Sequence, residues 1–66
     1  MKISVNGELR ELPPGSTVGE IIDGLGKGRR GMVAAVDEEI VPASRWDQTV
    51  LHENHRVEVL TAAQGG

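Results

Sequence analysis

The sequence predicts an α+β fold, in which a mixed sheet of about five strands carries one helix packed across one face. Three observations lead to this prediction: a hairpin signal at the start of the chain, one short amphipathic stretch, and three later runs of strand-forming residues. Their order along the chain is strand, strand, helix, strand, strand, strand. The 66 residues are enough for one domain. A domain of this size buries only about 60% of the surface that its unfolded chain exposes.

The opening hairpin is the clearest local signal. Residues 1–6 alternate between apolar and polar side chains, which is typical of a half-buried strand. The dipeptide Asn6-Gly7 follows, and it tolerates the positive φ angles of a two-residue hairpin turn. Residues 8–12 predict the returning strand, but its apolar residues, Leu9 and Leu12, break the alternation. We therefore expect a bulge in that strand or an early end to it.

One short helix is expected after the hairpin. Thr17 and Glu20 have the spacing of a capping box, in which the two side chains satisfy free amides at the start of a helix. Four apolar residues then follow the helical period and form one stripe: Val18, Ile21, Ile22 and Leu25. Gly24 or Gly26 ends the helix after about two turns. Because so short a helix is unstable alone in water, its stripe must lie on the sheet.

The middle of the chain predicts two further strands. Residues 32–36 are apolar at every position, which favours a central strand covered on both faces. After a turn at Asp37-Glu38, residues 39–41 predict a short strand that ends at Pro42.

The stretch that follows, residues 43–47, predicts a loop or a single helical turn with Ser44 as its cap. It contains Trp46, the one aromatic residue of the chain. We expect this large side chain to plug one end of a thin core.

The last strand, residues 56–61, leads into the end of the sequence. Val57 and Val59 alternate with Glu58 and Leu60, so the strand has one apolar face toward the core. Since one helix covers one side of the sheet, Leu60 is expected on the open side. We predict that Leu60 contacts a partner.

The sequence closes with Gln64-Gly65-Gly66. Residues 1–61 are expected to form the folded domain, and residues 62–66 a flexible C-terminal tail. From Thr61 onward the chain spans about 20 Å when fully extended, which is enough to enter the active site of another protein. Two glycines add nothing to a fold but fit a slot too narrow for side chains. On the dipeptide alone, a frayed chain end is the favoured interpretation.

Composition excludes several classes of function. Ten acidic and seven basic residues give a net charge of −3, which argues against nucleic acid as a partner. The chain has no cysteine, so disulfides, zinc ribbons and thiol nucleophiles are excluded. No apolar run has the length of a signal peptide or a membrane helix. We therefore expect a cytoplasmic protein with no membrane partner.

One glycine-rich stretch matches a nucleotide-binding motif in the wrong context. Residues 26–31 read G-x-G-x-x-G, but the dinucleotide fingerprint follows a strand and opens a helix, whereas this stretch follows a helix. Its basic residues are Lys27, Arg29 and Arg30. We interpret them as a solvated loop, with contact to an acidic partner as the alternative and binding to a phosphate backbone as the least favoured one.

The sequence offers few other residues that could bind a metal, catalyse a reaction or carry a prosthetic group. His52 and His55 lack a third ligand, so they are interpreted as polar loop residues and not as a metal site. No combination of residues suggests a catalytic triad, and no serine or lysine has the setting that carries a prosthetic arm. We predict no catalytic residue and no bound cofactor. The carboxylate of Gly66 is the one well-presented group that is left.

Taken in order, these segments resemble the ubiquitin-like β-grasp sulfur carriers, most closely those of thiamine (thiazole) biosynthesis. The resemblance covers the full length and implies the ubiquitin-like β-grasp fold. The residues that carry it are Val5-Asn6-Gly7, Gly15-Ser16-Thr17-Val18, Ile21-Ile22, Ala35-Val36-Asp37, Ile40-Val41-Pro42, Trp46 and Gly65-Gly66.

The resemblance implies that the chain is a protein co-substrate and not an enzyme. An adenylating partner similar to ubiquitin-activating enzymes would use ATP to adenylate Gly66. Sulfide equivalents from the persulfide of a cysteine desulfurase would then displace AMP and leave a C-terminal thiocarboxylate. Thiazole synthase would accept that sulfur. Gly65 and Gln64 would enter the active sites of these partners with Gly66.

Three alternatives stay open. The small subunit of molybdopterin synthase would carry the same thiocarboxylate on Gly66 but stay docked in a synthase. A ubiquitin-like modifier would be joined through Gly66 to lysines of its targets. A plain interaction or RNA-binding module would have an inert tail.

Overall fold

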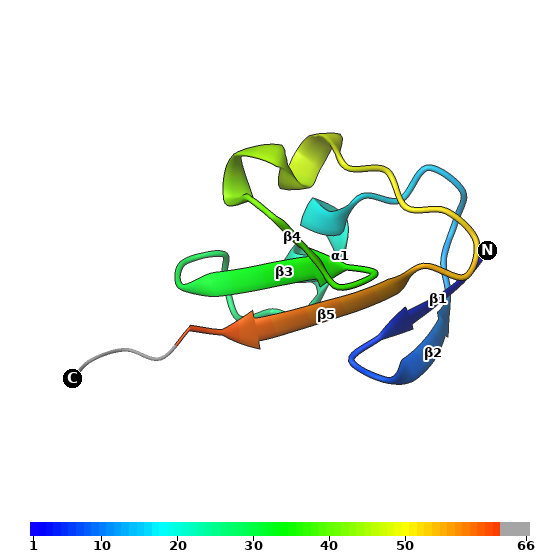
Figure 1. Cartoon of the computed structure of the whole chain (residues 1–66), viewed down its shortest axis with the longest axis horizontal. Coiled ribbons are helices and arrows are strands. Elements are labelled where there is room, and N and C mark those ends of the chain that lie inside the picture. Colours follow the sequence, from blue (N-terminus) through cyan, green and yellow to red (C-terminus); the bar gives the residue numbers. More distant parts are fainter. Residues whose placement is uncertain (63–66) are drawn as a thin grey trace.

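A five-stranded mixed sheet carries one α-helix across one of its faces (Figure 1). The structure is a computed structural model, and it describes residues 1–62. The elements are β1 (Lys2–Val5), β2 (Glu8–Glu11), α1 (Val18–Gly24), β3 (Met32–Val36), β4 (Glu39–Val41), the 3-10 helix η1 (Ala43–Gln48) and β5 (Arg56–Thr61). The strand order is β2-β1-β5-β3-β4. The predicted α+β class and the predicted order of elements are confirmed.

The opening hairpin forms as predicted. β1 and β2 pair antiparallel in unbroken register, and Asn6 and Gly7 between them have φ angles of 51° and 81°. Both angles are those of a type I′ turn, whose twist matches that of the two strands. β2 ends at Glu11, before Leu12, so the strand ends early and no bulge interrupts it.

Helix α1 begins at the predicted capping box. The hydroxyl of Thr17 accepts a hydrogen bond from the backbone amide of Glu20, and the carboxylate of Glu20 accepts one from the amide of Thr17. The helix ends before Gly26, whose φ angle of 74° is the left-handed value that closes many helices. No helix within residues 1–62 is long and apolar enough to cross a membrane.

The core lies between α1 and the sheet. Its buried apolar residues are Ile3, Val5, Val18, Ile21, Ile22, Ala34, Trp46, Leu51, Val57 and Val59. Trp46 belongs to this core and is only 2% exposed. Its Nε1 donates a hydrogen bond of 2.9 Å to the carbonyl of Val41, so the polar atom of the indole is satisfied.

Two predictions about the middle of the chain are wrong. Ser44 does not cap η1, because the helix begins directly after Pro42, whose fixed φ suits a helix start, and Ser44 already lies inside it. β3 is not covered on both faces, and only Ala34 of its residues is buried. The middle strand of the sheet is β5.

The side chain of Asn6 continues the pairing of β1 with β5 past the end of β1. The two strands are parallel and pair at Ser4 with Arg56 and at Val5 with Val57. One step further, Asn6 Nδ2 donates to the carbonyl of Val59 at 3.1 Å, and the amide of Val59 donates to Asn6 Oδ1 at 2.8 Å. A side-chain amide thus replaces a strand residue and satisfies both backbone groups of Val59.

Replacing Asn6 with glycine tests this contact, because glycine keeps the positive φ angle and removes only the two hydrogen bonds. We expect the free energy of unfolding, measured by urea denaturation, to fall by about 1–3 kcal/mol. Asn54→Gly is the control, since Asn54 also has a positive φ angle, of 72°, and its side chain is exposed. Equal losses in the two variants would show that the Asn6 side chain adds no stability.

Candidate functional site

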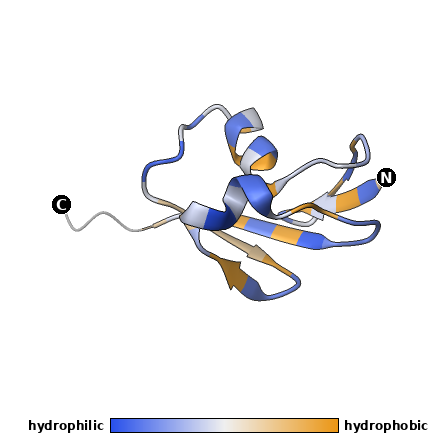
Figure 2. Ribbon diagram, turned by 90° about the horizontal axis from the view of Figure 1, so that it is seen from above, coloured by the Kyte–Doolittle hydropathy of each residue, from blue (hydrophilic) through white to orange (hydrophobic). Residues whose placement is uncertain are grey.

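The sheet face opposite α1 bears exposed apolar side chains. Along β5, buried Val57 and Val59 alternate with exposed Glu58 and Leu60, and the alternation of hydrophobic and hydrophilic positions is visible in Figure 2. Leu60 is 66% exposed and lies on the open face, as predicted. Its placement follows from the period-two alternation of a strand that is covered on one face only.

Leu60 belongs to a wider apolar surface that extends over β3 and β4. A shallow depression of about 260 Å³ is lined by Val33, Ala35, Glu38, Ile40, Glu58 and Leu60. The strand register places Val33 beside Leu60 and Ala35 beside both Ile40 and Glu58. Ile40 is as exposed as Leu60, at 66%. We call the apolar residues Val33, Ala35, Ile40 and Leu60 the Leu60 patch.

The charged edge of the Leu60 patch is acidic. Glu38 and Glu58 line the apolar depression and also a neighbouring depression of about 200 Å³, which includes Ser4 and Arg56. The guanidinium of Arg56 lies 3.9 Å from the Glu38 carboxylate. Contiguous exposed apolar surface with a polar rim is characteristic of a protein-binding site. Sequence reasoning found Leu60 and missed the rest of the patch. The apolar residues at every position of 32–36 were the signal, since one helix cannot cover both faces of that strand.

The end of β5 connects the Leu60 patch to the tail. Pairing with β3 continues past Thr61, where the amide of Ala62 donates a hydrogen bond of 2.6 Å to the carbonyl of Gly31. We call Ala62 and this hydrogen bond the tail root. It lies at the opposite end of the molecule from the amino terminus (Figure 1). The predicted reacting residue Gly66, with Gly65 and Gln64, lies outside the described residues.

Arg29 is not part of a solvated basic loop, so that interpretation is wrong for this residue. Its guanidinium binds the carboxylate of Asp23, at the end of α1, at 2.8 Å and that of Asp47, in η1, also at 2.8 Å. It also lies over the ring of Trp46, 5.9 Å from the ring centre. We call this set of contacts the Arg29 clamp. The two helices can approach closely here because Gly19 has no side chain. A Cβ at this position would overlap the Asp47 carboxylate.

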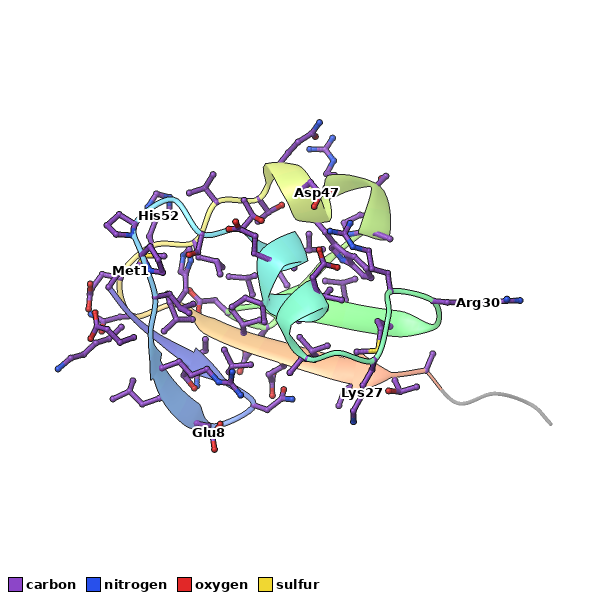
Figure 3. All side chains as sticks on the ribbon, turned by 180° about the vertical axis from the view of Figure 1, so that it is seen from behind. Met1, Glu8, Lys27, Arg30, Asp47 and His52 are labelled. Atoms are coloured by element: carbon purple, nitrogen blue, oxygen red, sulfur yellow. The ribbon has the colours of Figure 1, made fainter. Side chains whose placement is uncertain are left out.

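Lys27 and Arg30 differ from Arg29. Both are exposed, and neither takes part in an ion pair among residues 1–62. Figure 3 shows both side chains extending outward from the loop before β3, at the end of the molecule where β5 ends. These two residues therefore keep the interpretation of a solvated basic loop.

The histidines form a local contact in the loop before β5. The backbone amide of His52 donates to Nδ1 of His55 at 3.0 Å, and the two rings meet edge to face with centres 5.4 Å apart. Within the described part of the chain, no group of three or more possible ligands is placed to hold a metal ion.

Comparison with known proteins identifies the family. The model of the ThiS family matches residues 3–66. The chain belongs to the ThiS family. The sulfur carrier protein ThiS of Escherichia coli (strain K12) is 26% identical over 66 residues, which cover 100% of each chain.

Solved structures confirm the ubiquitin-like β-grasp fold. The crystal structure of the thiamine biosynthesis protein (ThiS) from Geobacter metallireducens matches with a TM-score of 0.82 at 22% identity, over 100% of both chains. An NMR solution structure of a thiamine biosynthesis protein from Geobacter metallireducens matches with a TM-score of 0.72 at 23% identity, over 100% of this chain and 88% of that one.

The Arg29 clamp predicts a dependence of stability on pH. Hydrogen bonds from Arg29 hold the pKa of Asp23 and of Asp47 below the usual value of 3.8. Because these carboxyls have a lower pKa in the folded than in the unfolded chain, the clamp stabilises the fold above that usual value. Its contribution is lost as the pH falls through the folded-state pKa values. We expect the free energy of unfolding in urea to fall from about pH 5 toward about pH 2.

Arg29→Gln should remove this part of the pH dependence. Some acid sensitivity remains in that variant, because the amino group of Met1, 2.9 Å away, also lowers the pKa of Glu11. Arg30→Gln is the matched control, since it removes the same charge from the same loop without touching the clamp. If both variants keep the pH dependence of the unchanged protein, the clamp does not couple stability to pH.

Proposed function

We propose that this chain is a sulfur carrier protein of thiamine (thiazole) biosynthesis. The observation that carries the proposal is the family match, which extends to residue 66. The curated relative that aligns over the full length of both chains is named a sulfur carrier protein. The chain offers one group for this chemistry, the carboxylate of Gly66, and it acts as a substrate of partner enzymes in the cytoplasm.

The proposed chemistry begins with activation, because a free carboxylate is a poor electrophile. An adenylating enzyme similar to ubiquitin-activating enzymes joins Gly66 to AMP with consumption of ATP. The outer sulfur of a cysteine desulfurase persulfide attacks the Gly66 carbonyl and displaces AMP, which leaves an acyl disulfide. A thiol then cleaves the S–S bond of that intermediate, is itself oxidised to a disulfide, and leaves the thiocarboxylate on Gly66. Thiazole synthase receives that sulfur, and the carrier returns with its original carboxylate. ATP belongs to the activating partner, and the carrier itself needs no cofactor.

The described residues support this role through position. β5 is paired on both sides, with β1 and with β3, so the strand that leads to the tail is held firmly. The Leu60 patch lies on this strand and its neighbours, next to the tail root. Because Leu60 and the tail root lie on the same strand, the distance between the patch and the tail root is fixed. A partner that docks on the patch is therefore also positioned relative to the tail root. The absence of a Cβ at Gly65 and Gly66 suits entry into a narrow active site.

Leu60→Glu tests the docking role of the patch. Because Leu60 is 66% exposed, we expect the free energy of unfolding to change by no more than about 0.5 kcal/mol. Binding to the adenylating enzyme or to thiazole synthase, measured by calorimetry, should weaken by about tenfold. Leu9→Glu is the control, since Leu9 is 68% exposed on the edge strand β2, outside the patch. Equal binding by the two variants would contradict a contact at Leu60, and a large loss of stability would place it in the core.

Changes at Gly66 test the proposed function itself. We expect that removing Gly66, or adding one residue after it, leaves the unfolding transition unchanged. Neither variant should support growth without thiamine in a strain that lacks its own carrier. Ala63→Ser, which preserves the length and end of the tail, should support growth. Growth of the extended variant without thiamine would contradict the proposal. A defect confined to molybdenum-cofactor-dependent growth would favour the molybdopterin synthase subunit.

A further inference from the structure

The loop between α1 and β3 is fixed next to the tail root. The carbonyl of Gly31 accepts the hydrogen bond from Ala62, so Arg30 is one residue away from the point where the tail begins. Gly26, Gly28 and Gly31 have φ angles of 74°, 76° and 74°, which bend the loop sharply. The middle of the loop is held to the body of the protein by the Arg29 clamp.

This arrangement separates the three basic residues of the loop into two groups. Arg29 is neutralised by Asp23 and Asp47, whereas Lys27 and Arg30 are exposed and have no ion-pair partner within residues 1–62. The clamp fixes the loop so that the two remaining cations extend outward (Figure 3). They extend in different directions from the loop (Figure 3) and are two cations without ion-pair partners among the described residues of a protein whose net charge is −3.

We propose that Lys27 and Arg30 are a docking site for acidic side chains at the entrance of the active site that adenylates Gly66. The inference rests on the proposed function. It adds a second contact surface, Lys27 and Arg30, to the Leu60 patch, and it specifies that the partner carries negative charge opposite this surface. The partner's entrance would present aspartate or glutamate opposite these two residues.

The length of the tail supports this location. Four residues follow Ala62 in the sequence, and four extended residues span at most about 14 Å. An active site that reacts with Gly66 therefore brings its entrance close to the tail root. Residues 62–66 have no charged side chain, so a charged entrance would act on the loop that holds the tail root, in which Arg30 precedes Gly31 and Lys27 lies three residues before Arg30.

The Leu60 patch and the loop differ in charge. Glu58 lies at the patch on β5, whereas Glu38 follows the end of β3 that pairs with Val57. The Glu38 carboxylate lies 3.9 Å from the guanidinium of Arg56. The loop presents Lys27 and Arg30, so a partner that contacts both surfaces meets opposite charges, which favours one orientation of docking. Nucleic acid is a poorer fit for the loop, because two cations on a negatively charged protein neutralise few phosphates.

The test is the kinetics of adenylation by the activating enzyme from the same organism, with ATP and this carrier as substrates. The double variant Lys27→Gln/Arg30→Gln should raise the KM for the carrier by about fivefold and leave kcat within about twofold. The control is Lys2→Gln/Arg45→Gln, which removes the same charge from exposed residues in β1 and η1. It should leave both parameters within about twofold. The KM of the unchanged protein should rise with salt more steeply than that of the loop variant.

The outcomes separate this inference from the proposed function. Adenylation of the unchanged carrier with equal KM values for the loop and control variants would overturn the docking site and leave the proposed function intact. No adenylation of the unchanged carrier by the active enzyme would overturn the proposed function, and the inference with it. The loop variant could also keep the adenylation kinetics of the unchanged protein and lose binding to a labelled single-stranded RNA. That result would assign the site to nucleic acid and contradict the proposal.

Discussion

The parallel pairing of β1 with β5 is the constraint on which the rest of the structure depends. It places the last strand of the chain in the middle of the sheet, so that β5 contributes Val57 and Val59 to the core and Leu60 to the open face. The same strand leads directly to the tail root. The part of the chain that is proposed to react with partners therefore follows the middle strand of the sheet, which is paired on both sides.

A small core makes this pairing depend on a few specific contacts. One short helix covers the sheet, and a two-turn helix has little stability of its own. The Asn6 side chain extends a parallel ladder that has only two residue pairs. The Arg29 clamp lies over Trp46 and joins α1 to η1. These contacts stabilise one layer of the protein and leave the opposite face of the sheet available for binding.

Local sequence signals predicted the elements of the fold well. The Asn6-Gly7 turn, the capping box at Thr17 and the alternation of residues 56–61 each depend on neighbours in the sequence. Leu60 was predicted on the open face for the same reason. Composition alone could not decide what the unbroken apolar run of 32–36 means. A buried strand between two layers and a strand with a binding face have the same residue pattern.

Contacts between distant residues could not be predicted from the sequence. Arg29 looked like one of three equivalent loop cations, because its partner Asp47 lies 18 positions away in the sequence. The sequence predicts Asn6 as a residue of the hairpin turn, but nothing near it in the sequence indicates that its side chain contacts Val59. The Leu60 patch was found only in part, since Ile40 joins it through the register of β4 on β3. The tail residues Gln64, Gly65 and Gly66 stay a prediction.

The central claim is that the carboxylate of Gly66 is the working group and that the folded domain delivers it. Its most direct test is the intact mass of the protein, isolated from growing cells or incubated with the activating enzyme, ATP and a sulfur donor. The account predicts a mass increase equal to the exchange of one oxygen for one sulfur, confined to the C-terminal fragment. An unchanged mass under both conditions, with an active enzyme, would contradict it.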